Sequence, residues 1–177
     1  MKKVKFGVIG LGHIGKRHAE MIQRNPSCEL IAISDILPKQ DLGLESLNVP
    51  FYNNYQNLLI SHPEIQVVCI CTPNGSHSNI ALDVLEFDKH LVIEKPIGLS
   101  KAKCEKVIFK ALQKHKQIFA VMQNRYSPPS QWLKELIETN QLGEIFIVQV
   151  NCYWNRDDRY YKEGEWKGTQ ENDGGTL

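Results

Sequence analysis

A lysine that directly follows an apolar run is the residue best placed for acid–base chemistry in this 177-residue chain. Residues 90–94 predict a strand, and Lys95 and Pro96 come straight after it. In an open parallel sheet, ligands bind outside the carboxyl ends of the strands. There, Lys95 could hydrogen-bond a substrate hydroxyl, stabilise a developing alkoxide and relay a proton. The alternative is that Lys95 is a surface lysine at a turn.

A glycine-rich turn near the N-terminus predicts a site for a dinucleotide. The pattern Gly-x-Gly-x-x-Gly lies between an apolar run and an amphipathic stretch, and Asp35 ends the next apolar run. Glycines at these positions permit the turn, the approach of a pyrophosphate and close helix packing, while the helix N-terminus attracts phosphate. The strand–turn–helix–strand–Asp order makes the motif specific, although a chance glycine turn is the alternative. The predicted binding residues are Gly10, Leu11, Gly12, His13, Ile14, Gly15 and Asp35.

The type of dinucleotide depends on Asp35. Its oxygens can accept hydrogen bonds from both adenosine ribose hydroxyls, and its charge repels a 2′-phosphate. No arginine follows directly, although Lys39 lies near enough to permit some NADP binding. The sequence therefore predicts NAD as the cofactor.

A third group of polar residues follows the strand predicted at 66–71. Thr72, Pro73 and Asn74 come at its carboxyl end and are expected to face the cofactor. His77 begins the next helix, where it either reaches the nicotinamide half or bonds backbone or water. Glu94 either pairs with Lys95 or holds the nicotinamide ribose.

The elements that must position these groups alternate along the chain. Strands are predicted at 4–9, 29–34, 66–71, 90–94 and 117–122, and helices at 13–24, 54–61, 76–87, 100–115 and 128–139. This order predicts an α/β fold with a doubly wound parallel sheet, the Rossmann arrangement. Ser100 and Ser127 are expected to cap the helices that follow them.

A second domain is predicted to begin after residue 122. The sequence from Ile145 to Trp154 alternates apolar and polar residues, which predicts a long strand typical of an antiparallel sheet. The predicted domains are therefore 1–122, which binds NAD, and 123–177, the incomplete start of a substrate and oligomerisation domain. The last residues look like a loop that leads into another element, so we expect a truncated chain; a natural frayed end is the alternative.

Composition excludes several classes of protein. The formal net charge of +1 provides no electrostatic footprint for nucleic acid or membrane, and no apolar run is long enough to span a bilayer. The five cysteines fit neither a zinc site nor a disulfide framework, and Cys69 and Cys71 should face the same side of a strand. A cytoplasmic protein with reduced thiols and no metal site is expected.

Together, the glycine turn, Cys71-Thr72-Pro73-Asn74 and Glu94-Lys95-Pro96 resemble the Gfo/Idh/MocA oxidoreductase family over the whole chain. That resemblance implies a Rossmann domain followed by an α/β domain with a large open sheet, a bound nicotinamide dinucleotide and a homo-oligomer. It also implies that Lys95 is catalytic and that both Lys95 and Gln123 contact the cofactor.

Later segments resemble the UDP-N-acetylglucosaminuronate 3-dehydrogenases of bacterial surface-polysaccharide synthesis: 123–129, 150–161, 166–169 and 173–175. The implied reaction is oxidation of the sugar C3 hydroxyl with hydride transfer to NAD. Arginines suit the phosphates and carboxylate of such a substrate, although ion pairs and packing are the alternative roles. The candidate substrate-binding residues are Lys95, Asn124, Arg125, Arg156, Arg159 and Tyr160.

The chain departs from the family pattern in one respect. The family places a catalytic histidine shortly after the Gly-Gly segment, and no histidine follows His115 here. We therefore expect this chain to bind dinucleotide but to turn over poorly. The alternatives are a dehydrogenase for inositol or a simple sugar, and a non-catalytic NAD(H)-binding protein.

Overall fold

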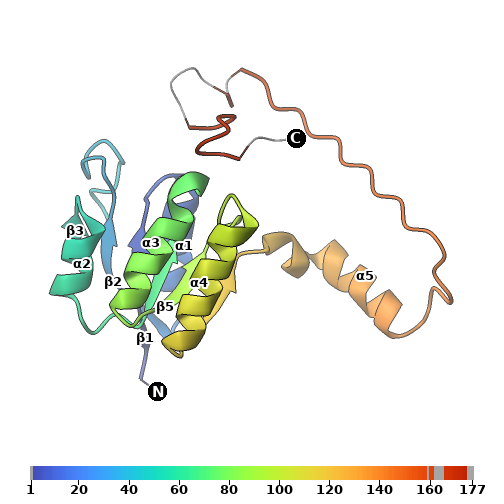
Figure 1. The fold of residues 1–177 in the computed structure, drawn as a ribbon, viewed down its shortest axis with the longest axis horizontal. Helices are drawn as coiled ribbons and strands as arrows, with labels where there is room; N and C mark the ends of the chain where they lie inside the picture. The colour runs from blue at the N-terminus through green and yellow to red at the C-terminus, as the bar shows by residue number, and fades with distance from the viewer. Residues whose placement is uncertain (1, 159, 162–165, 175–177) are drawn as a thin grey trace. The chain divides into compact units, whose positions relative to one another are not determined.

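Six strands and five α-helices alternate along the part of the chain that the computed structural model describes, residues 2–158, 160–161 and 166–174 (Figure 1). The strands are β1 (Val4–Ile9), β2 (Cys28–Ser34), β3 (Phe51–Tyr52), β4 (Val67–Ile70), β5 (His90–Ile93) and β6 (Ile118–Ala120). The α-helices are α1 (His13–Arg24), α2 (Tyr55–Ser61), α3 (His77–Glu86), α4 (Lys101–Gln113) and α5 (Pro128–Glu138). Two 3₁₀ helices, η1 (Asn74–Ser76) and η2 (Gln123–Tyr126), precede α3 and α5.

The strands form one parallel sheet in the order β3-β2-β1-β4-β5-β6. The order reverses between β1 and β4, because the chain first builds outward on one side of β1 and then returns to build on the other. In doubly wound sheets this reversal opens a crevice at the carboxyl ends of the two central strands, which is where ligands bind. The predicted Rossmann arrangement is confirmed.

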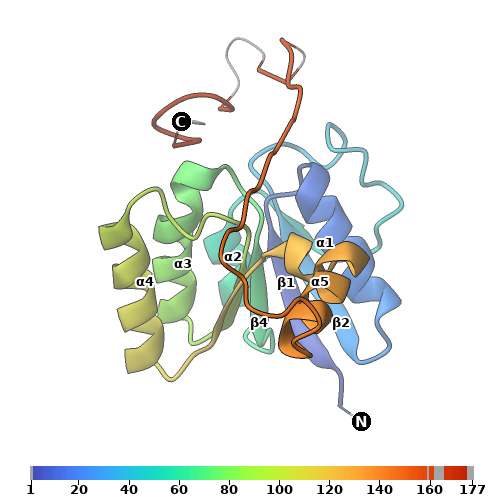
Figure 2. The same ribbon diagram turned by 90° about the vertical axis from the view of Figure 1, so that its right-hand side faces the viewer.

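Helices cover both faces of the sheet, and the alternation of side chains along β4 assigns them (Figure 2). Val68 and Ile70 pack with α2, α3 and α4 in one core, whereas Cys69 and Cys71 pack with Ala19 and Ile22 of α1 in the other. Successive residues of a strand point to opposite faces, so this division follows from a period of two. The expectation that the two cysteines share a face is confirmed.

Burial protects these two thiols from ionisation. It raises the pKa of Cys69 to about 12 and raises that of Cys71 as well, and the nearby Glu94 carboxylate acts in the same direction. At pH 9 we expect iodoacetamide to alkylate the exposed Cys152 and to leave Cys69 and Cys71 unmodified. Peptide mass spectrometry measures this, with the urea-unfolded chain as control. Equal labelling of all three in the folded chain would contradict it.

The same two thiols make stability depend on pH. Their pKa values in the folded chain lie above those of the unfolded chain, so the unfolded chain loses these protons first. The stabilisation is complete below about pH 8.5, the ordinary pKa of a thiol, and is lost as the pH rises through the folded value.

Two helix starts show how local sequence acts. Ser100 caps α4 as predicted, because its hydroxyl accepts a hydrogen bond of 3.3 Å from the Lys103 backbone N–H. Ser127 lies at the cap position of α5, but its hydroxyl donates to the Asn124 carbonyl at 3.0 Å and makes no cap hydrogen bond. The first two positions of α5 are prolines, which have no N–H for a cap to receive.

One strand was not predicted, and one predicted strand is not formed. The two-residue strand β3 was missed because Phe51 and Tyr52 are too short a run to show alternation. The strand predicted over 145–154 is absent from the described residues, and Phe146, Ile147, Val148 and Val150 are between 76% and 86% exposed. A strand needs a neighbour to receive its backbone hydrogen bonds, and an alternating pattern does not provide one.

The chain divides into two compact units. One contains the six strands up to Val121 together with the segment that begins at Gly168, and the other is Met122–Lys167. The division differs from the predicted boundaries because residues 168–174 pack with the first unit. Among the residues described, no helix is both long and apolar enough to cross a membrane.

Candidate dinucleotide and catalytic site

The glycine turn joins β1 to α1, and its three glycines have different surroundings. Gly10 has a φ of +86°, and a Cβ there would lie 2.7 Å from the Cys71 carbonyl carbon. A Cβ on Gly15 would lie 1.8 Å from the Gly10 carbonyl oxygen. A Cβ on Gly12 would meet no protein atom within 4 Å. Protein packing therefore requires glycine at 10 and 15 but not at 12, and the open surroundings of Gly12 fit a pyrophosphate that approaches the backbone.

The N-terminus of α1 is built to receive an anion. The helix begins at His13, its cap residue Gly12 has no side chain to offer, and its first turn contains no acidic residue. The first backbone bond of the helix runs from Lys16 N–H to the Gly12 carbonyl at 3.1 Å, so the N–H groups of His13, Ile14 and Gly15 precede the helical ladder. These donors and the positive end of the helix dipole suit phosphate.

Asp35 connects the carboxyl end of β2 to the glycine turn. Its Oδ2 accepts a hydrogen bond of 2.5 Å from the Leu11 N–H, and its Oδ1 accepts one of 2.9 Å from the Leu37 N–H. An ionised carboxylate has about four acceptor positions, so Asp35 retains capacity for ribose hydroxyls. The Leu11 N–H is used by Asp35 and its side chain is fully buried in the core, so a contact of the Leu11 backbone with the cofactor stays a prediction.

Lys39 could bind the 2′-phosphate of NADP only by giving up a hydrogen bond within the protein. Its ammonium group donates a hydrogen bond of 2.8 Å to the Leu47 carbonyl and is partly buried there. A 2′-phosphate near Asp35 would therefore meet the carboxylate without a free lysine beside it. This arrangement agrees with NAD as the cofactor.

Replacing Asp35 by alanine is expected to weaken NAD⁺ binding about tenfold or more and NADP⁺ binding much less. The variant loses charge-assisted hydrogen bonds to the ribose but also removes the repulsion of a 2′-phosphate. Calorimetric titration with each dinucleotide measures both effects. Lys39→Ala is the matched control and should leave NAD⁺ affinity unchanged, whereas equal losses for the two dinucleotides in the Asp35 variant would contradict this role.

His77 connects two loops and is buried. Its side chain is 0% exposed, its Nδ1 lies 2.7 Å from the Pro96 carbonyl oxygen, and its Nε2 lies 2.7 Å from the Thr72 carbonyl oxygen. The structure thus favours the backbone-bonded role over direct contact with the nicotinamide. His77 holds the loop after β4 against the loop that carries Lys95.

The loop after β4 is organised by its own side chains. The Ser76 hydroxyl donates to the Pro73 carbonyl at 2.7 Å, so the Thr72 hydroxyl, 2.7 Å away, donates to Ser76. Asn74 donates through Nδ2 to Asp173 at 2.8 Å, and Gly75 N–H donates to the Asn172 carbonyl at 2.8 Å. Asn74 therefore anchors the segment 168–174, while contact of Thr72 and Pro73 with the cofactor stays a prediction.

Glu94 and Lys95 lie at the carboxyl end of β5 and have opposite environments. Lys95 is exposed, whereas Glu94 is 7% exposed and lies 2.9 Å from Nε2 of His18, measured to its Oε1. The pairing of Glu94 with Lys95 is therefore not formed. Sequence reasoning missed His18, because a histidine in the middle of an amphipathic helix gives no sign of its partner.

The remaining candidates belong to the second unit. Gln123, Asn124 and Arg125 are exposed in η2. The Arg156 guanidinium lies over the Tyr160 ring at 4.4 Å from its centroid, which is a cation–π contact. Arg159 lies outside the described residues. Roles in substrate binding for Asn124, Arg125, Arg156, Arg159 and Tyr160, and a cofactor contact for Gln123, stay predictions.

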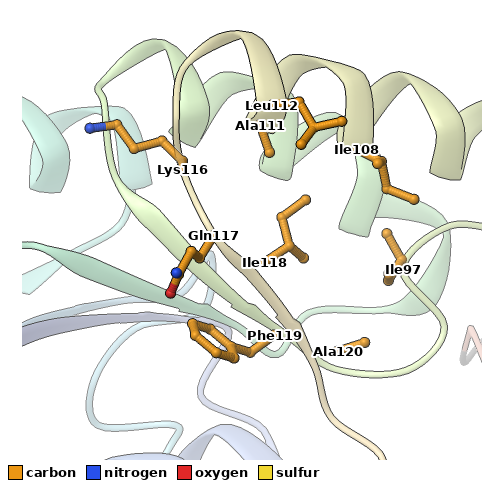
Figure 3. Close-up of a pocket in the computed structure, with 9 residues that line it drawn as sticks. All are labelled: Ile97, Ile108, Ala111, Leu112, Lys116, Gln117, Ile118, Phe119 and Ala120. Atoms are coloured by element: carbon orange, nitrogen blue, oxygen red, sulfur yellow. The ribbon is translucent and has the colours of Figure 1, made fainter.

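An apolar pocket lies away from these groups, between α4 and the edge strand β6 (Figure 3). It has a volume of about 500 Å³ and lacks acidic and histidine side chains. Its lining residues are Ile97, Ile108, Ala111, Leu112, Lys116, Gln117, Ile118, Phe119 and Ala120. This mostly apolar lining suits a pyrophosphate less well than the glycine turn and the N-terminus of α1 do.

Comparison with known proteins matches this geometry. Residues 4–123 match the Gfo/Idh/MocA family, an oxidoreductase family with an NAD-binding Rossmann fold. The WlbA dehydrogenase of Chromobacterium violaceum, solved with NADH and UDP-GlcNAcA, is 27% identical with a TM-score of 0.90, covering 98% of this chain and 50% of its own. The WlbA dehydrogenase of Bordetella pertussis, solved with the same two ligands, is 28% identical with a TM-score of 0.89. The match covers 98% of this chain and 52% of the Bordetella chain.

A third solved structure has a different substrate. The scyllo-inositol dehydrogenase of Lactobacillus casei, solved with NAD(H) and scyllo-inositol, is 26% identical with a TM-score of 0.74, covering 81% of this chain and 43% of its own. Curated relatives that are 28% identical are matched over 44% of their length, so the chain spans about half the length of the relatives it matches.

The family match, the parallel sheet and the anion-binding turn agree with one another. The match covers all six strands, and the turn and Asp35 provide the groups that a pyrophosphate and an adenosine ribose require. The chain therefore belongs to the Gfo/Idh/MocA oxidoreductase family and contains its NAD-binding Rossmann domain.

Proposed function

We propose that the complete protein is an NAD-dependent dehydrogenase that oxidises the C3 hydroxyl of a UDP-N-acetylhexosaminuronate, a step in building bacterial surface sugars. The observation that carries this proposal is the extent of structural likeness. The WlbA dehydrogenases match 98% of the chain, whereas the inositol dehydrogenase matches 81%. The match to the WlbA structures continues beyond the cofactor domain, and this favours a substrate of the class that they bind.

Different residues of this chain would bind the cofactor, act on the substrate hydroxyl and bind the charged groups of the substrate. Asp35 and the N-terminus of α1 hold the adenosine and pyrophosphate of NAD, whose nicotinamide accepts the hydride. Lys95, exposed at the carboxyl end of β5, donates a hydrogen bond to the substrate hydroxyl and stabilises the oxygen as it loses its proton. Arg125, Arg156 and Arg159 supply positive charge for the phosphates and carboxylate. A homo-oligomer in the cytoplasm is part of the same proposal.

Oxidation of an inositol is the second candidate. It is favoured by curated inositol dehydrogenases that are 27% to 28% identical over 83% to 85% of this chain. An inositol carries no phosphate and needs fewer cations than a UDP-sugar acid. Arg125, Arg156 and Arg159 favour the charged substrate.

The test is an assay of the complete protein for NADH formation with UDP-GlcNAcA, myo-inositol and scyllo-inositol in parallel. Turnover with UDP-GlcNAcA and none with either inositol is expected. The reverse result would replace the proposal by the second candidate. If none of the three compounds is turned over while NAD⁺ still binds by calorimetry, both candidates are wrong, and a simple-sugar dehydrogenase and a non-catalytic NAD(H)-binding protein are the alternatives.

A further inference from the structure

The side chains of His18 and Glu94 connect the phosphate-binding helix to the strand that carries Lys95. The Nε2 atom of His18 lies 2.9 Å from Oε1 of Glu94, and the two side chains are 16% and 10% exposed. A carboxylate only accepts hydrogen bonds, so His18 is the donor. The pair joins α1 to the carboxyl end of β5, which are 76 residues apart in the sequence.

The orientation of Glu94 follows from strand pairing. Cys69 pairs with Val92 across β4 and β5, and Val92 packs in the same core as Cys69 and Cys71, on the face covered by α1. Two residues further along the same strand direction, Glu94 returns to this face.

A carboxylate that is nine-tenths buried requires hydrogen-bond partners. His18 satisfies Oε1, and within the described part of the chain no hydrogen bond reaches Oε2. One acceptor is thus held in place by His18 while the other remains available at the edge of the sheet where ligands bind. Without His18 the carboxylate would lose the one hydrogen-bond donor that reaches it among the described residues and could turn toward solvent.

The position of this acceptor indicates which part of NAD it faces. Asp35 at the end of β2 marks the adenosine, and the turn after β1 marks the pyrophosphate. The other half of the dinucleotide continues across the sheet over β4 and β5, where Glu94 lies.

From this geometry we propose that His18 is a positioning residue, which holds Glu94 so that its second oxygen accepts hydrogen bonds from the nicotinamide riboside half of NAD. His18 itself makes no contact with the dinucleotide. This inference rests on NAD binding and not on the identity of the substrate.

The test compares two ligands that share the adenosine and diphosphate. NAD⁺ contains the nicotinamide riboside and ADP lacks it. Calorimetry on His18→Phe is expected to show about a tenfold rise in the Kd for NAD⁺ and a change of less than about twofold for ADP. His18→Gln, which keeps an N–H donor at a similar distance, should restore NAD⁺ affinity. An equal loss for both ligands, or no loss for NAD⁺, would overturn the proposal.

A matched control and a double variant complete the experiment. His62 is 17% exposed and pairs with Glu64 at 3.2 Å, but it lies in the connection to the amino end of β4. His62→Phe should leave both Kd values unchanged. If His18 acts through Glu94, His18→Phe has little further effect in a Glu94→Gln background, because one interaction is already lost. Additive losses in the double variant would show that His18 acts by another route.

Discussion

Replacing Lys95 by methionine in the complete protein is expected to lower turnover by about 10²- to 10⁴-fold, the range for loss of a positioned acid–base group. Lys95 is exposed at the carboxyl end of β5, and its ammonium makes no hydrogen bond or ion pair among the described residues. Its removal therefore costs the fold little. Steady-state kinetics with the substrate that the complete protein accepts measures the effect, and calorimetry should show NAD⁺ affinity retained within about threefold.

A second lysine supplies the control for this experiment. Lys101 begins α4, six residues after Lys95, and its side chain is 89% exposed. Lys101→Met removes the same charge near the same edge of the sheet and should leave turnover unchanged. Similar losses for the two variants would mean that net charge, and not a positioned ammonium, explains the effect of Lys95.

Alanine substitutions at two glycines of the same turn are expected to differ in their effect on the stability of the fold. Gly15→Ala places a Cβ 1.8 Å from the Gly10 carbonyl oxygen, which the backbone must move to relieve. A loss of about 3 kcal/mol or more in the free energy of unfolding follows, as for severe overpacking. NAD⁺ binding is lost with the turn. Thermal unfolding followed by circular dichroism measures the change in stability.

Gly12→Ala should leave the fold intact and still weaken NAD⁺ binding. Its φ of −62° is accessible to alanine, and its Cβ meets no protein atom within 4 Å. The free energy of unfolding should change by about 1 kcal/mol or less. Because the new methyl group lies where the pyrophosphate approaches the backbone, the Kd for NAD⁺ should rise about 10- to 100-fold. Unchanged affinity in a folded variant would show that the pyrophosphate does not approach Gly12.

Much of the cofactor domain could be predicted from local sequence. The positions of β1 and α1 were predicted to the residue, because an apolar run, a glycine turn and an amphipathic helix each carry their own local signal. The same holds for Asp35, whose spacing from the turn places it at the end of the neighbouring strand. The parallel sheet followed from the alternation of strands and helices, since parallel strands need crossover helices.

Strand pairing could not be predicted where the pattern depended on a neighbour. Residues 145–154 alternate as a strand does, yet a strand forms only where another strand receives its hydrogen bonds. In contrast, β3 has almost no pattern of its own and forms because β2 offers an edge to Phe51 and Tyr52. In both cases the deciding partner is remote from the local sequence.

Motifs and their spacing identify the groups that could bind a dinucleotide, and packing of the folded chain leaves only some of these groups available. Leu11 and His77 belong to the motifs, but packing directs the N–H of Leu11 to Asp35 and both ring nitrogens of His77 to carbonyl oxygens. His18 belongs to no motif, and only the approach of α1 to the end of β5 gives it Glu94 as a partner. Spacing along the chain shows which hydrogen-bonding groups a segment contains, whereas contacts between distant segments determine which partner each of these groups binds.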